Sequence, residues 1–322
     1  MTGLQLYLDC VVFVFGAVIG SFLNVCIHRM PLDQSIVTPP SHCPHCNQRI
    51  GWIDNIPLVS YLVLGRKCRH CGVSISPRYF WVELLTATLF LAIWLQFGGA
   101  RMPFDWRILP YWLLVGGLIV ATFVDLEHYI VPDEVSVGGA VAGVLACTVW
   151  PALQGQTSCI LGAFSSIKGM LIGSALLYWI AVFGQVVFKK EAMGLGDVKL
   201  MGMMGAFLGC PAVIFIMVIS SGIGGVAGLM TVLLSPARRH AVGGLKGLLM
   251  FWRHDDLQVS GYLGLDDWRL SDETEVRAMG SAIPYGPYLA LAAVLWIFLG
   301  DYVCNCDYIR NMISSMAEIG IK

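Results

Sequence analysis

Long apolar stretches recur along this 322-residue chain, and they constrain its fold more than any other feature. Most of them approach the roughly 20 residues that an α-helix needs to cross a bilayer. Only 13% of the residues are charged and the mean hydropathy is +0.72, whereas about a quarter of the residues of a soluble domain are charged. The sequence therefore predicts an all-α integral membrane protein with about eight transmembrane helices, at 7–27, 80–97, 108–124, 135–151, 168–188, 198–209, 211–234 and 284–303.

The distribution of lysine and arginine predicts how these helices are oriented. If the N-terminus is outside, most of the 20 lysines and arginines fall in inner loops, as the positive-inside rule requires. No basic segment precedes the first stretch and no small-residue cleavage site follows it, so we expect a retained helix and not a signal peptide. The net charge of −1 gives no indication of nucleic-acid binding, and no such partner is expected. The predicted division is a first transmembrane helix at 1–27, a cytoplasmic loop at 28–79, a transmembrane core at 80–234, a cytoplasmic acidic insertion at 235–282, and a last helix with an outer tail at 283–322.

Two C-x-x-C motifs lie in the first cytoplasmic segment, CPHC at 43–46 and CRHC at 68–71. Paired motifs of this kind present four thiolates to one tetrahedral zinc ion, so Cys43, Cys46, Cys68 and Cys71 are predicted to bind structural zinc. A pair of disulfides is the alternative, which a reducing cytoplasm disfavours. His45 and His70 lie inside the motifs as bystanders, whereas His42 is a possible substitute ligand. Because a segment this short buries little core, zinc would stabilise it as a small loop domain.

Two aspartates occupy unusual positions at the ends of apolar stretches. Asp125 ends the third stretch and Asp197 begins the sixth, and the predicted topology places both at the inner face of the membrane. Two neighbouring, partly desolvated carboxyl groups share a proton, so one can activate water while the other acts as an acid. Gly194 and Gly196 flank the second aspartate and would let an extended substrate approach it. This arrangement predicts aspartic-protease chemistry.

The non-catalytic alternative for a lone acidic residue at a membrane boundary is a solvated helix cap. Asp133, Glu127 and Glu134 fit that role. Asp125 and Asp197 are distinguished from them only as a pair, because the distance between them does not follow from their sequence separation.

Several motifs together resemble the type IV prepilin peptidase family, the bifunctional leader peptidases and N-methyltransferases of pilus and type II secretion systems. A lone G-x-G-D would be weak, because presenilin-like enzymes also carry it, but the order of motifs is specific. The matching stretches are GSFLNVCIHRMP (20–31), the paired C-x-x-C with WIDNIPLVSYL (52–62), ISPRYFWVELLTA (75–87), DLEHYIVPD (125–133), GLGDVKL (194–200) and IPYGPYLA (283–290).

The resemblance implies that Asp125 and Asp197 are the catalytic pair and that the four cysteines bind zinc. It implies an enzyme of the bacterial inner membrane that removes the leader of prepilins or pseudopilins after a glycine, on the cytoplasmic side, and then methylates the new N-terminal amine from S-adenosylmethionine. Pilus or secretion machinery would be a possible partner.

The methyl-donor site is harder to place. No glycine-rich dinucleotide fingerprint follows a strand, so a pocket for S-adenosylmethionine would have to lie between the zinc loop and the membrane helices. Arg66, Lys67 and Glu83 are candidates for binding charged groups there, with salt-bridged loop charges as the alternative. The acids between Asp255 and Glu275 form either a solvated insertion or a surface that attracts a basic leader or a partner.

Two rival functions remain open. In a proton-coupled transporter, Asp125 and Asp197 would be relay carboxylates, although no internal repeat is evident and the four cysteines would have no clear use. In a zinc-stabilised scaffold without activity, replacement of Asp197 by asparagine would leave function intact.

Overall fold

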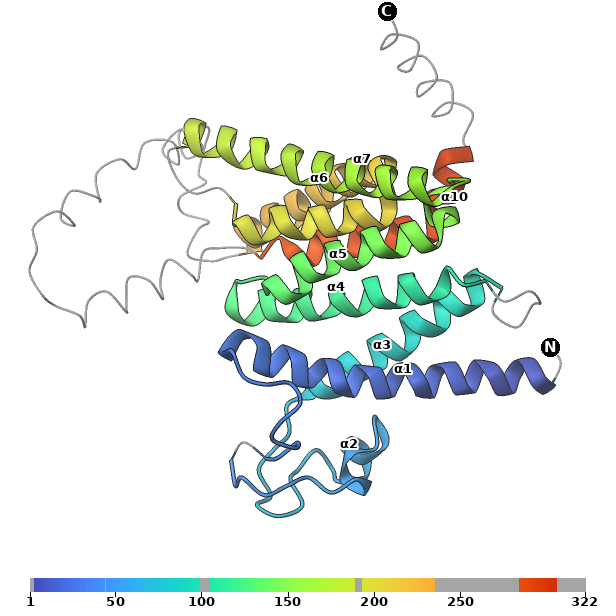
Figure 1. Ribbon diagram of the computed structural model, residues 1–322. Helices are drawn as coiled ribbons and strands as arrows, with labels where there is room; N and C mark the ends of the chain where they lie inside the picture. Colours follow the sequence, from blue (N-terminus) through green and yellow to red (C-terminus); the bar gives the residue numbers. More distant parts are fainter. Residues whose placement is uncertain (1–2, 44, 99–104, 189–192, 235–283, 306–322) are drawn as a thin grey trace, which may run out of the picture.

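The computed structural model describes residues 3–43, 45–98, 105–188, 193–234 and 284–305. Helices dominate these residues, and the β-pairing among them is limited to two isolated bridges. Most of the long helices run roughly side by side (Figure 1). They are α1 (Gly3–Arg29), α2 (Val59–Val63), α3 (Pro77–Gln96), α4 (Ile108–His128), α5 (Asp133–Val149), α6 (Cys159–Phe188), α7 (Leu195–Leu234) and α10 (Gly286–Asn305), with the 3-10 turns η1 (Met30–Leu32), η2 (Ile53–Asn55) and η3 (Pro151–Gln154).

The prediction of an all-α membrane protein is confirmed, and each of the eight apolar stretches corresponds to a helical segment. Six of the described helices are long and apolar enough to cross a bilayer. The count differs from eight because α5 has only 17 residues and because 198–209 and 211–234 both belong to α7. The expected start of α6 at 168 was too late, since the helix begins at Cys159. The charge of Lys168 suggests a helix boundary, but a long exposed side chain can extend along a helix to reach polar surroundings.

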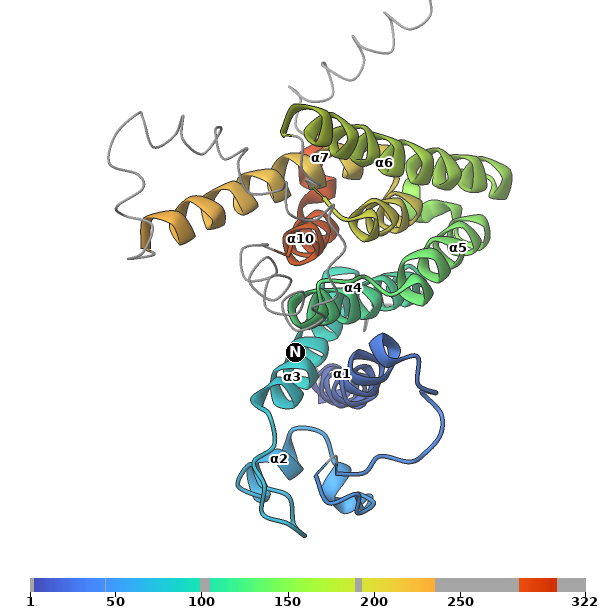
Figure 2. The same cartoon turned by 90° about the vertical axis from the view of Figure 1, so that its left-hand side faces the viewer.

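The helix pair α1 and α3 forms one side of the bundle, and α5, α6, α7 and α10 form the other. Figure 2 looks along the bundle and shows α4 between these two groups. The segment between α1 and α3 contains α2 and lies below the C-terminal half of α1 in Figure 1. The predicted insertion at 235–282 and the chain after 305 lie outside the described residues.

A sharp break divides α7 at Gly209. This residue has φ 80° and ψ 177°, outside the helical region, and Pro211 follows it. A positive φ favours glycine, and proline has no N–H to donate to the preceding turn. The break therefore follows directly from the G-C-P sequence at 209–211, and it gives Asp197 its own short helical segment.

Side chains of the neighbouring elements replace the helical hydrogen bonds lost near this break. The carbonyl oxygen of Ala206 accepts from Ser166 Oγ at 2.7 Å, from Gln154 Nε2 at 2.8 Å and from Cys147 Sγ at 3.4 Å. Because lipid offers no donors, a freed carbonyl at membrane depth must be satisfied within the protein. Ala206 thus joins α7 to α5, α6 and η3.

Glycines allow α6 and α7 to approach with their backbones in contact. A Cβ atom on Gly169 would lie 2.2 Å from the carbonyl oxygen of Gly205, and a Cβ on Gly205 would lie 2.2 Å from that of Gly169. In α1, Gly16 and Gly20 approach the α3 backbone in the same way, with Cβ positions 2.8 and 2.7 Å from Cα atoms of Ala87 and Glu83. Small residues at helix crossings are typical of membrane proteins.

We expect Gly205→Ala to destabilise the protein by about 1–3 kcal/mol, because the added methyl group must displace the α6 backbone. Thermal unfolding in detergent measures this as a lower midpoint. Gly138→Ala is the matched control, since a Cβ there meets nothing within 4 Å and alanine is the better helix former. Equal midpoints for the two variants would contradict the close crossing.

Candidate functional site

The two aspartates lie at the same end of the bundle, as the predicted topology requires. Asp125 belongs to the last turn of α4 and Asp197 to the first turn of α7. Both are buried, with 6% and 8% of their surface exposed, and they lie within electrostatic reach of each other. The structure therefore brings these carboxyl groups together in a desolvated setting, where they share a proton more easily than both ionise.

A third element completes this site. The first residue of α10, Gly286, donates its backbone N–H to Asp125 Oδ2 at 3.0 Å. A Cβ on Gly286 would lie only 2.7 Å from that oxygen, so glycine is required for the close approach. The N–H groups of a first helical turn have no partner within the helix, and a carboxylate is a suitable acceptor for them.

The other acids at this end have surface roles. Asp133 is exposed and pairs with Lys199 Nζ at 2.7 Å, joining the start of α5 to the start of α7. Glu127 pairs with Arg78, which joins the end of α4 to the start of α3. Glu134 is exposed in the first turn of α5. None of the three contributes to the buried pair.

The two glycines before Asp197 have different surroundings. Gly194 is exposed, and a Cβ there would meet only one atom within 4 Å, the nitrogen of Gly196 at 3.9 Å. Gly196 packs against Val131 of the α4–α5 connection, with Cβ contacts of 3.1 Å and longer. A Cβ at Gly194 would therefore have open space among the described residues, whereas Gly196 is tightly packed.

The two C-x-x-C motifs adopt the same local structure twice. In the first, Cys43 N donates to Gln48 O and Asn47 N donates to Cys43 O; in the second, Cys68 N donates to Val73 O and Gly72 N donates to Cys68 O. Isolated bridges close both turns, between His42 and Arg49 and between Lys67 and Ser74. Asn47 and Gly72 occupy equivalent left-handed positions with φ 55° and 71°. Asparagine and glycine tolerate that conformation best.

The two turns bring their four thiols into one cluster. The sulfur atoms of Cys43, Cys46, Cys68 and Cys71 all lie within 4.8 Å of one another, and those of Cys43 and Cys71 are 3.9 Å apart. All four are free thiols, as are the other described cysteines. A tetrahedral zinc ion with Zn–S bonds of about 2.3 Å needs sulfur separations of about 3.8 Å. The cluster fits such an ion, and its closed thiol set leaves no position for a reacting water.

The geometry of the second turn also favours the thiolate form of Cys68. Backbone N–H groups of Cys71 and His70 point at the Cys68 sulfur and lower the pKa of that thiol to about 6. At Cys71 the N–H of Val73 lowers the pKa, but burial and the thiols of Cys68, Cys46 and Cys43 raise it, with a net value of about 11. Four clustered thiols cannot all ionise without a compensating cation, and a divalent metal supplies that charge.

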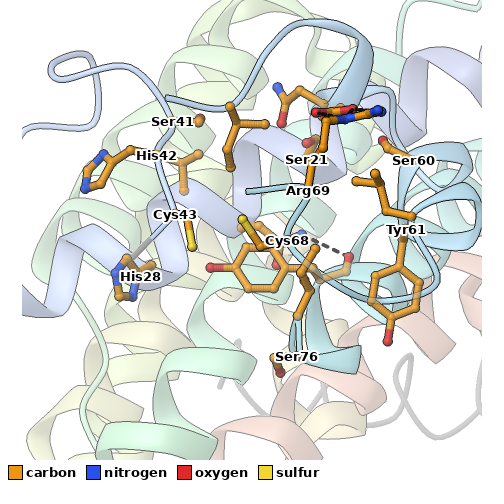
Figure 3. Close-up of a pocket in the computed structure, with 18 of the residues that line it drawn as sticks. Ser21, His28, Ser41, His42, Cys43, Ser60, Tyr61, Cys68, Arg69 and Ser76 are labelled. Carbon is orange, nitrogen blue, oxygen red and sulfur yellow. Dashed lines mark hydrogen bonds and ion pairs between the residues drawn. The ribbon is translucent and has the colours of Figure 1, made fainter. Parts of the chain in front are cut away.

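A cavity of about 410 Å³ lies between this loop and the membrane helices α1 and α3 (Figure 3). The loop side includes Cys43, Cys68 and Tyr61, and the membrane side includes Ser21 and His28. Neither Asp125 nor Asp197 lines it. Its volume is within the range of small-molecule sites. The described residues thus hold a buried acid pair and, separate from it, a cavity between the loop and the membrane helices, which is where the sequence analysis expected a pocket.

The three cofactor-site candidates from the sequence differ in position. Glu83 lines the cavity, is 8% exposed, and accepts a hydrogen bond from Leu58 N through Oε2 at 2.7 Å. Arg66 and Lys67 are exposed and do not line the cavity. Their role in binding charged groups of a cofactor therefore stays a prediction, with no support from the lining of this cavity. Both belong to the turn that leads into Cys68, and their side chains project to solvent.

Sequence reasoning missed three contributors to these sites. Gly286 acts through its backbone N–H, Leu58 holds the zinc loop to α3 through its own N–H, and Asn24 lines the cavity from α1. The first two have no chemically active side chain, so only the unusual Y-G-P sequence at 285–287 could have drawn attention to Gly286. Asn24 was a visible signal, because an amide inside an apolar helix requires hydrogen-bond partners.

Two family models match the chain in succession. The N-terminal part, residues 14–97, matches the bacterial peptidase A24 N-terminal domain, which covers most of α1, the four-cysteine loop and α3. Residues 112–229 match the type IV leader peptidase family, which covers α4 to α7 with both buried aspartates. The boundary between the two matches falls between α3 and α4.

Curated relatives are similar over nearly the full chain. The chain is 35% identical to a prepilin leader peptidase/N-methyltransferase of Myxococcus xanthus over 315 residues, which is 90% of each chain. It is 30% identical to proteins of the same name from Aeromonas hydrophila, over 94% of each chain, and from Pseudomonas aeruginosa, over 90% of each. No solved structure gave a significant match.

Proposed function

The chain belongs to the type IV leader peptidase family, and on that premise we propose that it removes prepilin leaders with Asp125 and Asp197 and then methylates the new N-terminus. The observation that carries the assignment of the pair is their joint burial at one end of the bundle within electrostatic reach. None of the relatives described above is a transporter, so nothing favours the relay alternative.

The acid pair divides the work of peptide hydrolysis. One carboxylate takes a proton from water as the water attacks the scissile carbonyl, while the protonated partner donates its proton to the carbonyl oxygen. When the C–N bond breaks, the first carboxyl group gives the proton it took from water to the leaving amine, and its partner recovers a proton from a hydroxyl group of the tetrahedral intermediate. The N–H of Gly286 fixes Oδ2 of Asp125 and leaves its other oxygen free to face the water. Burial strengthens these interactions because the site excludes bulk solvent.

The substrate would approach from the open side of Gly194. A prepilin carries a basic leader before an apolar helix, so its cleavage junction, after a glycine, would lie at the membrane boundary when that helix sits in the bilayer. We place this boundary at the cytoplasmic face of the bacterial inner membrane, because most lysines and arginines fall in loops at that side. Pseudopilins of a secretion system and the assembly machinery itself are further candidate partners.

Methylation would use the separate cavity beneath the zinc loop. S-adenosylmethionine supplies an electrophilic methyl group when bound. A 410 Å³ cavity accommodates a ligand of that size class, and Tyr61, Tyr79 and His28 offer ring surfaces while Ser60 and Ser76 offer hydroxyl groups. Zinc at the four cysteines would hold the loop that covers this cavity in shape and take no part in either reaction.

Product analysis of a model prepilin tests this function directly. We expect the purified protein in detergent to release the leader, and to add the mass of one methyl group to the product only when S-adenosylmethionine is present. Leader release without methylation would leave a peptidase alone, and absence of release would reject the proposal.

We expect Gly286→Ala to reduce the rate of leader cleavage by about 10- to 100-fold, because a methyl group 2.7 Å from Asp125 Oδ2 must displace that carboxylate. Initial rates at saturating substrate measure the change. Gly222→Ala is the matched control, since its Cβ would meet nothing within 4 Å. Unchanged cleavage by a folded Gly286→Ala variant would remove Gly286 from the site.

A further inference from the structure

Two buried side chains with hydrogen-bond acceptors line the cavity from the membrane helices. Asn24 projects from α1 and Glu83 from α3, and they are 2% and 8% exposed. The crossing of α1 and α3 at Gly20 brings these helices close together, with a Gly20 Cβ position 2.7 Å from the Glu83 Cα atom. The membrane side of the cavity therefore carries a carboxylate and an amide from adjacent helices.

Both side chains have acceptor capacity that the protein does not use. Asn24 Nδ2 donates to the Tyr79 carbonyl at 3.0 Å, which orients the amide, and Asn24 Oδ1 has no hydrogen-bond partner among the described residues. Glu83 Oε2 accepts from Leu58 N at 2.7 Å, and Ser21 also interacts with this carboxylate. A carboxylate has about four acceptor positions, so two protein donors leave it unsaturated.

No cation of the protein compensates the Glu83 charge within the described residues. The arginines that line the cavity are engaged elsewhere. Arg29 donates to the carbonyls of Ser35 and Pro39, and Arg69 forms a bidentate pair with Asp54. A buried carboxylate and an unpaired amide oxygen in the lining of one cavity are costly unless a donor, best a cation, binds to them.

We propose that Asn24 and Glu83 form the binding site for the free N-terminal ammonium group of the cleaved substrate, which holds this amine in place for methylation. The inference rests on the proposed function. The substrate amine is the ligand that fits best, because both side chains come from membrane helices. The mature substrate begins with an apolar helix, whose first residue would emerge at the membrane boundary. The methyl donor, a soluble molecule, would enter from the loop side of the same cavity.

Binding of an apolar peptide with a free N-terminal amine, compared with the same peptide after N-acetylation, tests the proposal without any methyl donor. We expect wild-type protein in detergent to bind the free-amine peptide about tenfold or more tightly, because acetylation removes the charge that pairs with the buried carboxylate. Glu83→Gln, which keeps the side-chain volume, should abolish this preference. Asn24→Leu should weaken the preference for the free-amine peptide. Glu83→Asp, which keeps the carboxylate, should retain part of the preference that Glu83→Gln loses.

Glu134→Gln is the matched control, because it removes the same charge from an exposed position in α5 and should keep the preference. Equal affinity of wild-type protein for the two peptides, or a preference that survives in Glu83→Gln, would overturn the proposal. Weaker S-adenosylmethionine binding in Glu83→Gln with an intact amine preference would also overturn it, by assigning these acceptors to the donor. Leader cleavage and methylation by the wild type are measured separately, so failure of the proposed function is recognised independently.

Discussion

Replacement of Asp125 or Asp197 by asparagine is expected to lower the rate of leader cleavage by about 10³-fold or more. Each change removes a group that gains or loses a proton during the reaction, and general acid–base catalysis contributes about 10²- to 10⁴-fold for a single group. Asparagine has nearly the same shape as aspartate, so the packing of α4 against α7 and α10 should persist. Initial cleavage rates of a model prepilin measure the effect.

Asp133→Asn provides the control for these variants. It removes a carboxylate at the same end of the bundle, but this one is exposed and pairs with Lys199 at the surface. Exposed ion pairs contribute little to stability, so we expect nearly normal cleavage. If a folded Asp125→Asn or Asp197→Asn variant cleaved at the wild-type rate, the acid pair would not be the catalytic pair.

Loss of the metal is expected to affect the two activities unequally. In Cys68→Ser, or after treatment with a strong zinc chelator, the loop between α1 and α3 should lose its fixed shape, since metal binding supplies much of the folding free energy of small metal-binding domains. Methylation should then fall at least about tenfold more than leader cleavage, because the cavity depends on this loop whereas Asp125 and Asp197 lie on other elements.

Metal analysis and limited proteolysis complete that experiment. The wild type should contain one zinc ion per chain and resist cleavage within 28–79, and Cys68→Ser should lose both properties. Cys10→Ser is the control, since Cys10 is a free, exposed cysteine of α1 far along the sequence from the cluster. Full methylation by metal-free protein would contradict a role of the loop in shaping the cavity.

Much of the fold follows from local sequence patterns. Apolar length predicts each membrane helix, and the repeated C-x-x-C motifs predict the thiol cluster, because both signals depend on residues close in the chain. The boundary of α6 was less predictable, since a single charge such as Lys168 is tolerated inside an exposed helix. The joint position of Asp125 and Asp197 followed from topology, which fixes the membrane face without fixing a distance.

The contacts that complete the sites were not predictable in this way. The N–H of Gly286 reaches Asp125 across 161 positions of the chain, and the N–H of Leu58 reaches Glu83 from a loop into a membrane helix. Every residue except proline has a backbone N–H, so the residue type does not reveal which N–H will donate to a distant side chain. Such contacts are determined by tertiary packing alone. Arg66 and Lys67 show the converse case, where a chemically suitable side chain next to a motif is exposed and does not line the cavity.

The three hydrogen bonds to the Ala206 carbonyl determine how substitutions of their donors should combine. Three donors, from Ser166, Gln154 and Cys147, converge on one oxygen that has two lone pairs. They are therefore partly redundant, and removal of one leaves the others to satisfy the carbonyl. Ser166→Ala and Gln154→Leu should each be mild, whereas the double variant should cost more than the sum of the two. Because of this synergistic epistasis, substitutions at one of these positions would be tolerated during evolution, whereas substitutions at two of them together would be rare. The break in α7 would then persist while the side chains that donate to the Ala206 carbonyl change one at a time.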